Sequence, residues 1–182
     1  MAYMREIMGV PLHPLLGHVP IVLFVLLALL TLLYLLVPPV RQKIGWSITA
    51  LAVLTPASVY AAKWSGTGMK TEAARNAIDT HSGNANLLLW LTIAFLPVWL
   101  LFGALERGRR TALARHKEAA GPGPSDSETS APAPSRKDND PAAGGRTLFM
   151  LLFGAAMLGI VGWAGWCLYQ TWLTGASMAW GA

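Results

Sequence analysis

Long segments without charge are the feature that most constrains how this chain can fold. Residues 7–40, 44–62, 81–105 and 147–182 contain no Asp, Glu, Lys or Arg. About 20 apolar residues in a helix are enough to cross the hydrocarbon core of a bilayer. Charged residues make up 13% of the chain, whereas they make up about a quarter of an ordinary soluble domain. The sequence therefore predicts an all-α integral membrane protein with four transmembrane helices in an up-and-down bundle.

Prolines and polar residues set the expected helix boundaries. Pro14 favours the start of the first helix, because proline is preferred at the first helical position and pushes its predecessor out of helical geometry. Pro38 and Pro39 end that helix, and Asp79 or Thr80 would cap the third. The later helices are expected at 44–62, at 81–105 and from 147 to between 169 and 173, with residues 175–182 along the membrane interface.

These helices divide the chain into three parts. Residues 1–105 hold the first three helices, and residues 147–182 hold the fourth helix and its tail. Residues 106–146 begin as a basic juxtamembrane segment, in which His116 is expected to be solvated. The segment continues as a linker rich in Pro, Ala, Ser, Gly and Asp. With almost nothing apolar to bury, this linker is predicted to be disordered.

The distribution of Lys and Arg predicts the orientation. Most of these residues lie in the turn after the first helix and in the segment 106–146. Positive residues concentrate on the cytoplasmic side of membrane proteins. We therefore expect a multi-pass protein of the plasma (inner) membrane with both termini outside and the 106–146 loop in the cytoplasm. The first helix is expected to be retained, because no basic n-region precedes it and no cleavage site follows it.

Three of the four histidines fall where two helices begin. His13 and His18 stand at the start of the first helix and His81 at the start of the third. In an up-and-down bundle these helices run in the same direction, so the three side chains are expected at one depth. Ionisable residues beside the membrane core suggest a functional site, and neutral imidazole is the form that ligates a metal ion or haem iron.

Polar residues predicted at the same level could orient the imidazoles through their second nitrogen. They are Ser65, Thr67, Asp79, Asn84 and Asn86. The alternative is that each histidine only hydrogen-bonds a neighbouring helix end or water. A copper(I) site is a weaker possibility, because thioethers also lie on the outer side, at Met4, Met8, Met69 and Met178.

Other residue types point away from catalysis. The single cysteine, Cys167, excludes an intrachain disulfide and is expected to be a small buried residue. Four aromatic residues of the fourth helix are expected to pack the bundle and mark the interface: Trp163, Trp166, Tyr169 and Trp172. No arrangement of nucleophile, base and acid is visible, and no basic stretch interleaved with aromatics predicts nucleic-acid binding. The sequence predicts a redox subunit at most, and no catalytic residues.

The pattern His13-Pro14-x-x-x-His18-x-Pro20, followed by a Leu-rich span, Gly66 and His81, resembles a bacterial family of four-helix membrane proteins. That family is a domain of unknown function with an N-terminal His-Pro-x-x-x-His-Phe-Pro motif. The resemblance implies a fold more than an activity. Some relatives are joined to Rieske-type domains, which implies electron transfer. Here Val19 replaces the usual Phe, and the segment 162–169 lacks the family's histidine.

Two hypotheses follow. In the first, the protein is an electron-transfer subunit that binds a b-type haem near the outer leaflet. His81 would be one axial ligand and His18 or His13 the other, with Lys63, Lys70 and Arg75 neutralising the propionates. In the second, it is a non-catalytic accessory or assembly subunit that has no cofactor and only structural histidines. The expected partners are the lipid bilayer and a redox protein or larger membrane complex.

Overall fold

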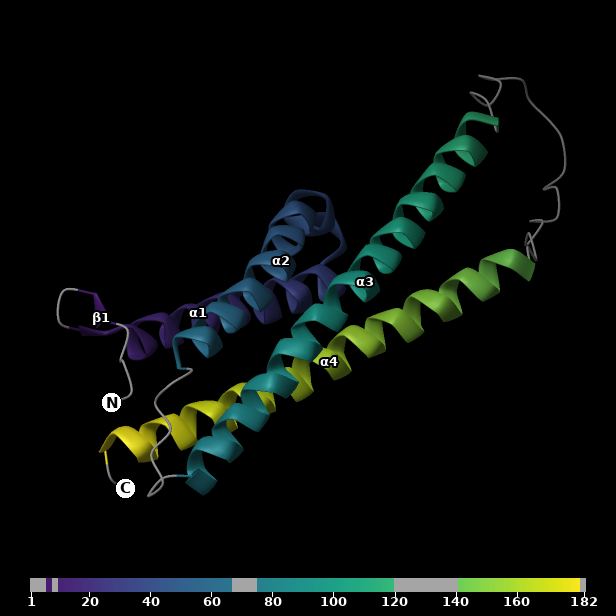
Figure 1. Cartoon of the computed structure of the whole chain (residues 1–182). Helices are drawn as coiled ribbons and strands as arrows, with labels where there is room; N and C mark the ends of the chain where they lie inside the picture. Colours follow the sequence, from purple (N-terminus) through teal and green to yellow (C-terminus); the bar gives the residue numbers. More distant parts are fainter. Residues whose placement is uncertain (1–5, 8–9, 67–74, 120–140, 181–182) are drawn as a thin grey trace, which may run out of the picture.

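The structure, a computed structural model, describes residues 6–7, 10–66, 75–119 and 141–180. It is all-α apart from one two-stranded antiparallel hairpin (Figure 1). In chain order the elements are β1 (Glu6–Ile7), β2 (Val10–Pro11), α1 (Leu12–Leu36), the 3-10 turn η1 (Pro38–Val40), α2 (Arg41–Ser65), α3 (Arg75–Ala119) and α4 (Pro141–Trp180). The hairpin was not predicted from the sequence.

All four long helices contain a stretch that is long and apolar enough to cross a membrane. These stretches are Leu15–Leu36, Pro38–Ser65, Asn76–Arg115 and Thr147–Met178. The predicted fold class is therefore confirmed, and the chain is a four-helix membrane protein. Helix α3 has 45 residues, which is about 68 Å at the usual rise and roughly twice the thickness of the hydrocarbon core.

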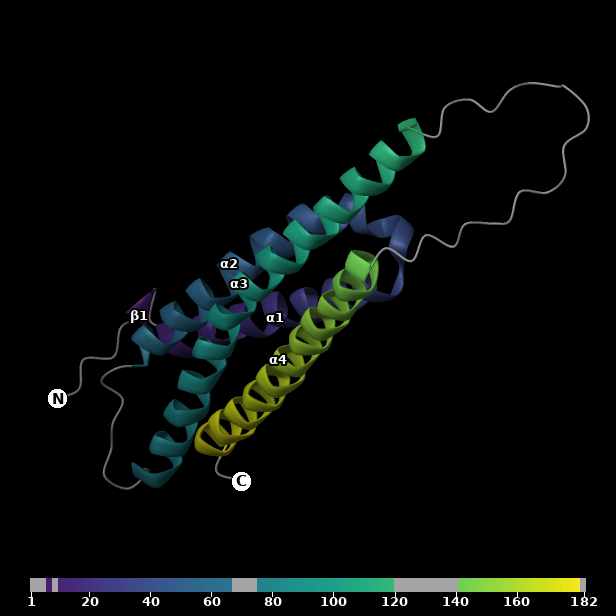
Figure 2. The ribbon, with the colours of Figure 1, turned by 90° about the vertical axis from the view of Figure 1, so that its right-hand side faces the viewer.

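The helices pack in chain order and alternate in direction. Helix α1 packs on α2, α2 on α3 and α3 on α4, while α1 and α4 touch over a smaller area. Figure 1 shows that α3 and α4 extend beyond the α1–α2 turn, and α3 is also seen to do so in Figure 2. We call the end where α1 and α3 begin the histidine end. The opposite end, with η1 and the later part of α3, is the basic end.

Buried positions recur every three or four residues along each helix. In α2 they are Ile48, Ala52, Thr55, Val59 and Ala62, and in α3 they are Leu88, Thr92, Phe95, Trp99, Phe102 and Glu106. This 3.5-residue spacing keeps one stripe of each helix against its neighbours, as in a left-handed coiled coil. The opposite faces are exposed and apolar, which suits contact with lipid. The core sits midway along the bundle, around Leu27, Ile48, Phe95 and Met157.

The helices run further than the sequence predicts. Helix α3 begins at Arg75, so Asp79 and Thr80 lie inside it and do not cap it. Helix α4 begins at Pro141 and continues to Trp180, so the expected interfacial tail is helical where it is described. The segments by which these helices exceed the prediction, 75–80, 142–146 and 174–180, contain no proline that would stop a helix. The predicted disorder of residues 120–140 lies outside the described residues.

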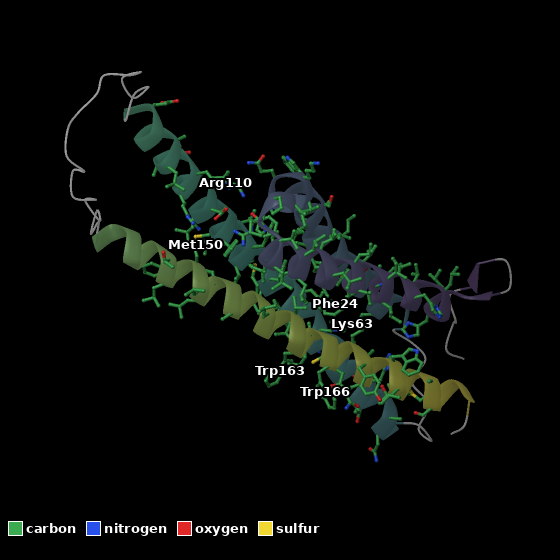
Figure 3. The ribbon with its side chains drawn as sticks, turned by 180° about the vertical axis from the view of Figure 1, so that it is seen from behind. Phe24, Lys63, Arg110, Met150, Trp163 and Trp166 are labelled. Carbon is green, nitrogen blue, oxygen red and sulfur yellow. The ribbon has the colours of Figure 1, made fainter. Side chains whose placement is uncertain are left out.

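The aromatic residues of α4 do not pack the bundle. Trp163, Trp166, Tyr169 and Trp172 are all exposed, and Figure 3 shows Trp163 and Trp166 on the side of α4 opposite to α1 and α2. That part of the prediction is wrong, because these residues lie outside the buried stripe of α4. Cys167 does belong to the stripe and is buried, as predicted.

Candidate functional site

His13 and His81 meet at the histidine end of the bundle. Their ring centroids lie 6.1 Å apart, and the ring planes are inclined at 73°. Both side chains are half-buried. His13 and His81 therefore lie at the same level of the bundle, although most of α1 and all of α2 separate them in the chain.

The His13 ring is held by the end of α2. Its Nδ1 atom lies 2.9 Å from the carbonyl oxygen of Ala62 and 3.2 Å from Oγ of Ser65. The backbone N–H of Gly66 bonds the carbonyl of Lys63, so the Ala62 carbonyl stays available to a side chain. The Ser65 hydroxyl also donates to that carbonyl, at 2.7 Å. The His13 contact therefore links α1 to the last turn of α2.

These partners determine which ring nitrogen of His13 carries the hydrogen. A carbonyl oxygen can only accept, so Nδ1 of His13 is the donor. In the neutral ring the lone pair then lies on Nε2. Ser65 was among the residues expected to orient a histidine. Ala62 was not, because any residue type presents a backbone carbonyl and the sequence gives no signal for it.

His81 is held by a side chain near the end of α4. Its Nδ1 atom lies 3.1 Å from Oγ1 of Thr174. The Thr174 hydroxyl donates to the carbonyl oxygen of Gln170, at 2.8 Å, which leaves its oxygen lone pairs to accept from His81. In this arrangement Nε2 of His81 also holds the lone pair. Thr174 was missed, because helix four was expected to end before it.

Two glycines let the rings approach these helix ends. A Cβ atom on Gly66 would lie 3.0 Å from Cε1 and Nδ1 of His13, and one on Gly175 would lie 3.3 Å from Cε1 of His81. Contacts that short force a neighbour to move. The histidine pair thus lies between two glycines, Gly66 directly after α2 and Gly175 in the later part of α4.

The other predicted site residues are placed as follows. His18 is exposed on α1, and the ring in contact with His81 is that of His13. Lys63 donates a hydrogen bond to Oδ1 of Asn86 (Lys63 is labelled in Figure 3). The Arg75 side chain and all of Lys70 lie outside the described residues.

Of the three histidines predicted to bind a metal ion, the structure shows His13 and His81 in contact with each other. No three His, Cys, Asp or Glu side chains gather around one point in the described ranges. Of the four methionines considered for copper, Met178 is exposed on α4, and the other three lie outside the described part of the chain.

A second polar cluster, at the basic end, was missed. Glu106 is buried, with Oε1 3.0 Å from Nη2 of Arg110 and 3.6 Å from Nη1 of Arg41. The sequence placed Glu106 in the juxtamembrane segment. Its spacing of four residues from Phe102 continues the buried stripe of α3, which is the signal that could have found it.

Comparison of the chain with protein-family models, with curated proteins and with solved structures gave no match. The resemblance of the His13 to Pro20 motif to a membrane family therefore stays a prediction. What this protein does has to be argued from the histidine pair itself.

Proposed function

We propose that this chain is a small membrane redox subunit that binds one b-type haem between His13 and His81. The observation that carries the proposal is the pairing of two half-buried imidazoles from different helices, each bonded to protein through Nδ1. A histidine that ligates a metal characteristically donates its other ring N–H to a protein acceptor, which fixes the tautomer and the ring orientation. Both members of the pair have this arrangement.

The spacing of the two rings supports a shared central atom. With metal–nitrogen bonds of about 2 Å, the ring centroids of two imidazoles on one atom lie about 5 Å apart at a tetrahedral angle and about 6.5 Å apart in line. The centroids of His13 and His81 are 6.1 Å apart, which lies within this range, so the two rings could hold one metal atom between them. Between the two histidines that the sequence left open, this favours His13 over His18 as the partner of His81.

The chain's own residues would act in three ways. Nε2 of His13 and Nε2 of His81 would hold the iron, and Ala62 and Thr174 would keep the rings in place through Nδ1. Lys63, anchored to Asn86 at this end, would neutralise a propionate, and Arg75 stays a candidate for the same role. When bound, the haem supplies one-electron chemistry at its iron.

Absorption spectra of the detergent-purified full chain test the proposal. Protein expressed with haem supplied should show a Soret band and sharp bands after dithionite reduction. His13→Asn and His81→Asn should lose them, because Asn keeps a donor near the Nδ1 position and has no counterpart of Nε2. His18→Asn is the matched control and should keep the haem. Haem retained in both His13→Asn and His81→Asn, or a colourless parent protein, would overturn the proposal. Copper found by metal analysis would indicate a copper site in place of the haem site.

A second function has its own supporting observation. The hydrogen bond of each histidine reaches the end of a neighbouring helix, from α1 to α2 and from α3 to α4. The pair would then only stabilise an accessory or assembly subunit of a larger membrane complex. In that case His13→Ala should destabilise the bundle and His13→Asn should not, the parent should be colourless, and the complex should copurify with the intact chain.

The excess of Lys and Arg at the basic end supports a cytoplasmic location for it. The haem would then lie near the outer leaflet of the plasma (inner) membrane. A reporter active only outside the cytoplasm, inserted between residues 120 and 140, should be inactive. An active reporter there would reverse the orientation.

A further inference from the structure

A cleft between α3 and α4 lies at the basic end, far from the histidine pair. Its volume is about 630 Å³. The walls that matter for its chemistry are Leu101, Leu105 and Met150, which are apolar, and Arg109 and Arg115, which are cationic. Figure 3 shows Met150 on α4 facing the later part of α3.

The polarity of the cleft changes along α3. Leu101 and Leu105 line the part nearer the middle of the helix, and Arg109 and Arg115 line the part nearer its end. From Leu101 to Arg115 the helix rises by about 21 Å. An apolar floor that leads to a cationic mouth matches a lipid that has an anionic headgroup above its acyl chains. Basic pockets between transmembrane helices are known to bind anionic headgroups.

The two arginines of the cleft differ from the other cations of this end. Arg41 and Arg110 are paired with Glu106. Within the part of the chain that the structure describes, neither Arg109 nor Arg115 has a carboxylate partner. The contact of Arg109 across the cleft is with the thioether of Met150, 3.9 Å from Nη1, which does not neutralise its charge. The positive charges of Arg109 and Arg115 are therefore available to bind an anionic ligand.

We infer that this cleft binds an anionic phospholipid. The phosphate would lie between Arg109 and Arg115, and one acyl chain would lie along Leu101, Leu105 and Met150. Arginine suits this role, since its planar fork binds phosphate through two parallel hydrogen bonds. The bound lipid would fill the space between α3 and α4 where these helices extend beyond α1 and α2 (Figure 1).

Native mass spectrometry of the full chain in detergent tests this inference. Phosphatidylglycerol and phosphatidylcholine with the same acyl chains are the probes. We expect phosphatidylglycerol to be retained preferentially. The double variant Arg109→Gln with Arg115→Gln should bind it about tenfold more weakly. Arg107→Gln is the matched control, because Arg107 has the same charge on the same helix, lies over Gly103 and does not line the cleft.

A second variant keeps the test informative if the charge variants do not fold. Ala104→Phe would fill the cleft and leave both arginines in place, and it should also lose the lipid. Equal retention of the two lipids, or unchanged binding in the double variant or in Ala104→Phe, would overturn the inference. Displacement of the lipid by millimolar inorganic phosphate alone would also overturn it, because the site would then select free anions.

Discussion

Glu106 of α3 forms a salt bridge with Arg41 of α2 at the basic end of the bundle, where its Oε1 atom lies 3.6 Å from Nη1 of the arginine. Arg110 donates to the same oxygen from Nε, at 3.1 Å, and from Nη2, at 3.0 Å. The carboxylate is buried, so one anion holds two cations from two helices at the edge of the membrane-spanning region. This cluster and the histidine pair lie at opposite ends of the bundle.

Glu106→Gln should destabilise the protein. The change removes the charge that compensates Arg41 and Arg110 in a poorly solvated place, which costs about 3–5 kcal/mol for fully buried pairs. Arg110 is about a third exposed, so we expect about 2–3 kcal/mol here. Unfolding in mixed detergent and SDS measures it. Glu118→Gln, at an exposed position, should change stability by less than about 0.5 kcal/mol, and an equal cost in both variants would contradict the prediction.

Arg41→Lys should also be destabilising, although it keeps the charge. Arg41 donates from Nε to the carbonyl oxygen of Tyr34, at 2.8 Å, and from Nη2 to that of Leu35, at 2.9 Å. These carbonyls belong to the last turn of α1, where backbone acceptors lack helical partners. A lysine ammonium cannot reproduce this fork, so we expect a loss of about 1–3 kcal/mol in the same unfolding assay. Lys43→Arg, at an exposed site, should be neutral. If Arg41→Lys leaves the stability unchanged, the hydrogen bonds of Arg41 to the end of α1 do not stabilise the protein.

Gly66→Ala should act through His13. Its backbone has φ −83°, which alanine adopts easily, so the effect comes from the Cβ atom 3.0 Å from the imidazole. We expect a loss of about 1 kcal/mol in the parent and little loss in a His13→Ala background, which a double-mutant cycle measures. Gly83→Ala meets nothing within 4 Å and should stabilise α3 by up to about 1 kcal/mol. An equal cost of Gly66→Ala in both backgrounds would show that His13 is not responsible.

Gly165→Leu should weaken the contact between α4 and α1. A Cβ atom there would lie 3.6 Å from Cε1 of Phe24, so alanine fits and the longer side chain does not. Overpacking of this kind costs about 1–3 kcal/mol. Gly162→Leu, three residues away with nothing within 4 Å, should be neutral or slightly stabilising, because leucine forms helices better than glycine. Thermal unfolding followed by circular dichroism gives the unfolding temperature of each variant. Equal unfolding temperatures for Gly165→Leu and Gly162→Leu would contradict the packing of α4 on α1.

Four glycines in the middle of α4 divide in the same way. Gly154 lies near Leu35 and Gly165 near Phe24, whereas Gly159 and Gly162 have open space where a side chain would be. Their residue type alone does not separate the two pairs. What separates them is the rotation of α4 about its axis, which the sequence left open.

The amino-acid sequence by itself determined the class of protein and the number of spans. Charge-free length and proline positions suffice for this, because a bilayer accepts only segments whose backbone groups are satisfied internally. The sequence also predicted that His13 and His81 lie at the same end of the bundle, because each stands at the start of a helix and these two helices run in the same direction. Which faces of the helices meet was decided only in the tertiary structure. In lipid the outer face of a helix is as apolar as the buried one, so no amphipathic pattern marks the buried stripe. The seating of His13 against Ala62, the hold of Thr174 on His81 and the burial of Glu106 all depend on that choice of face.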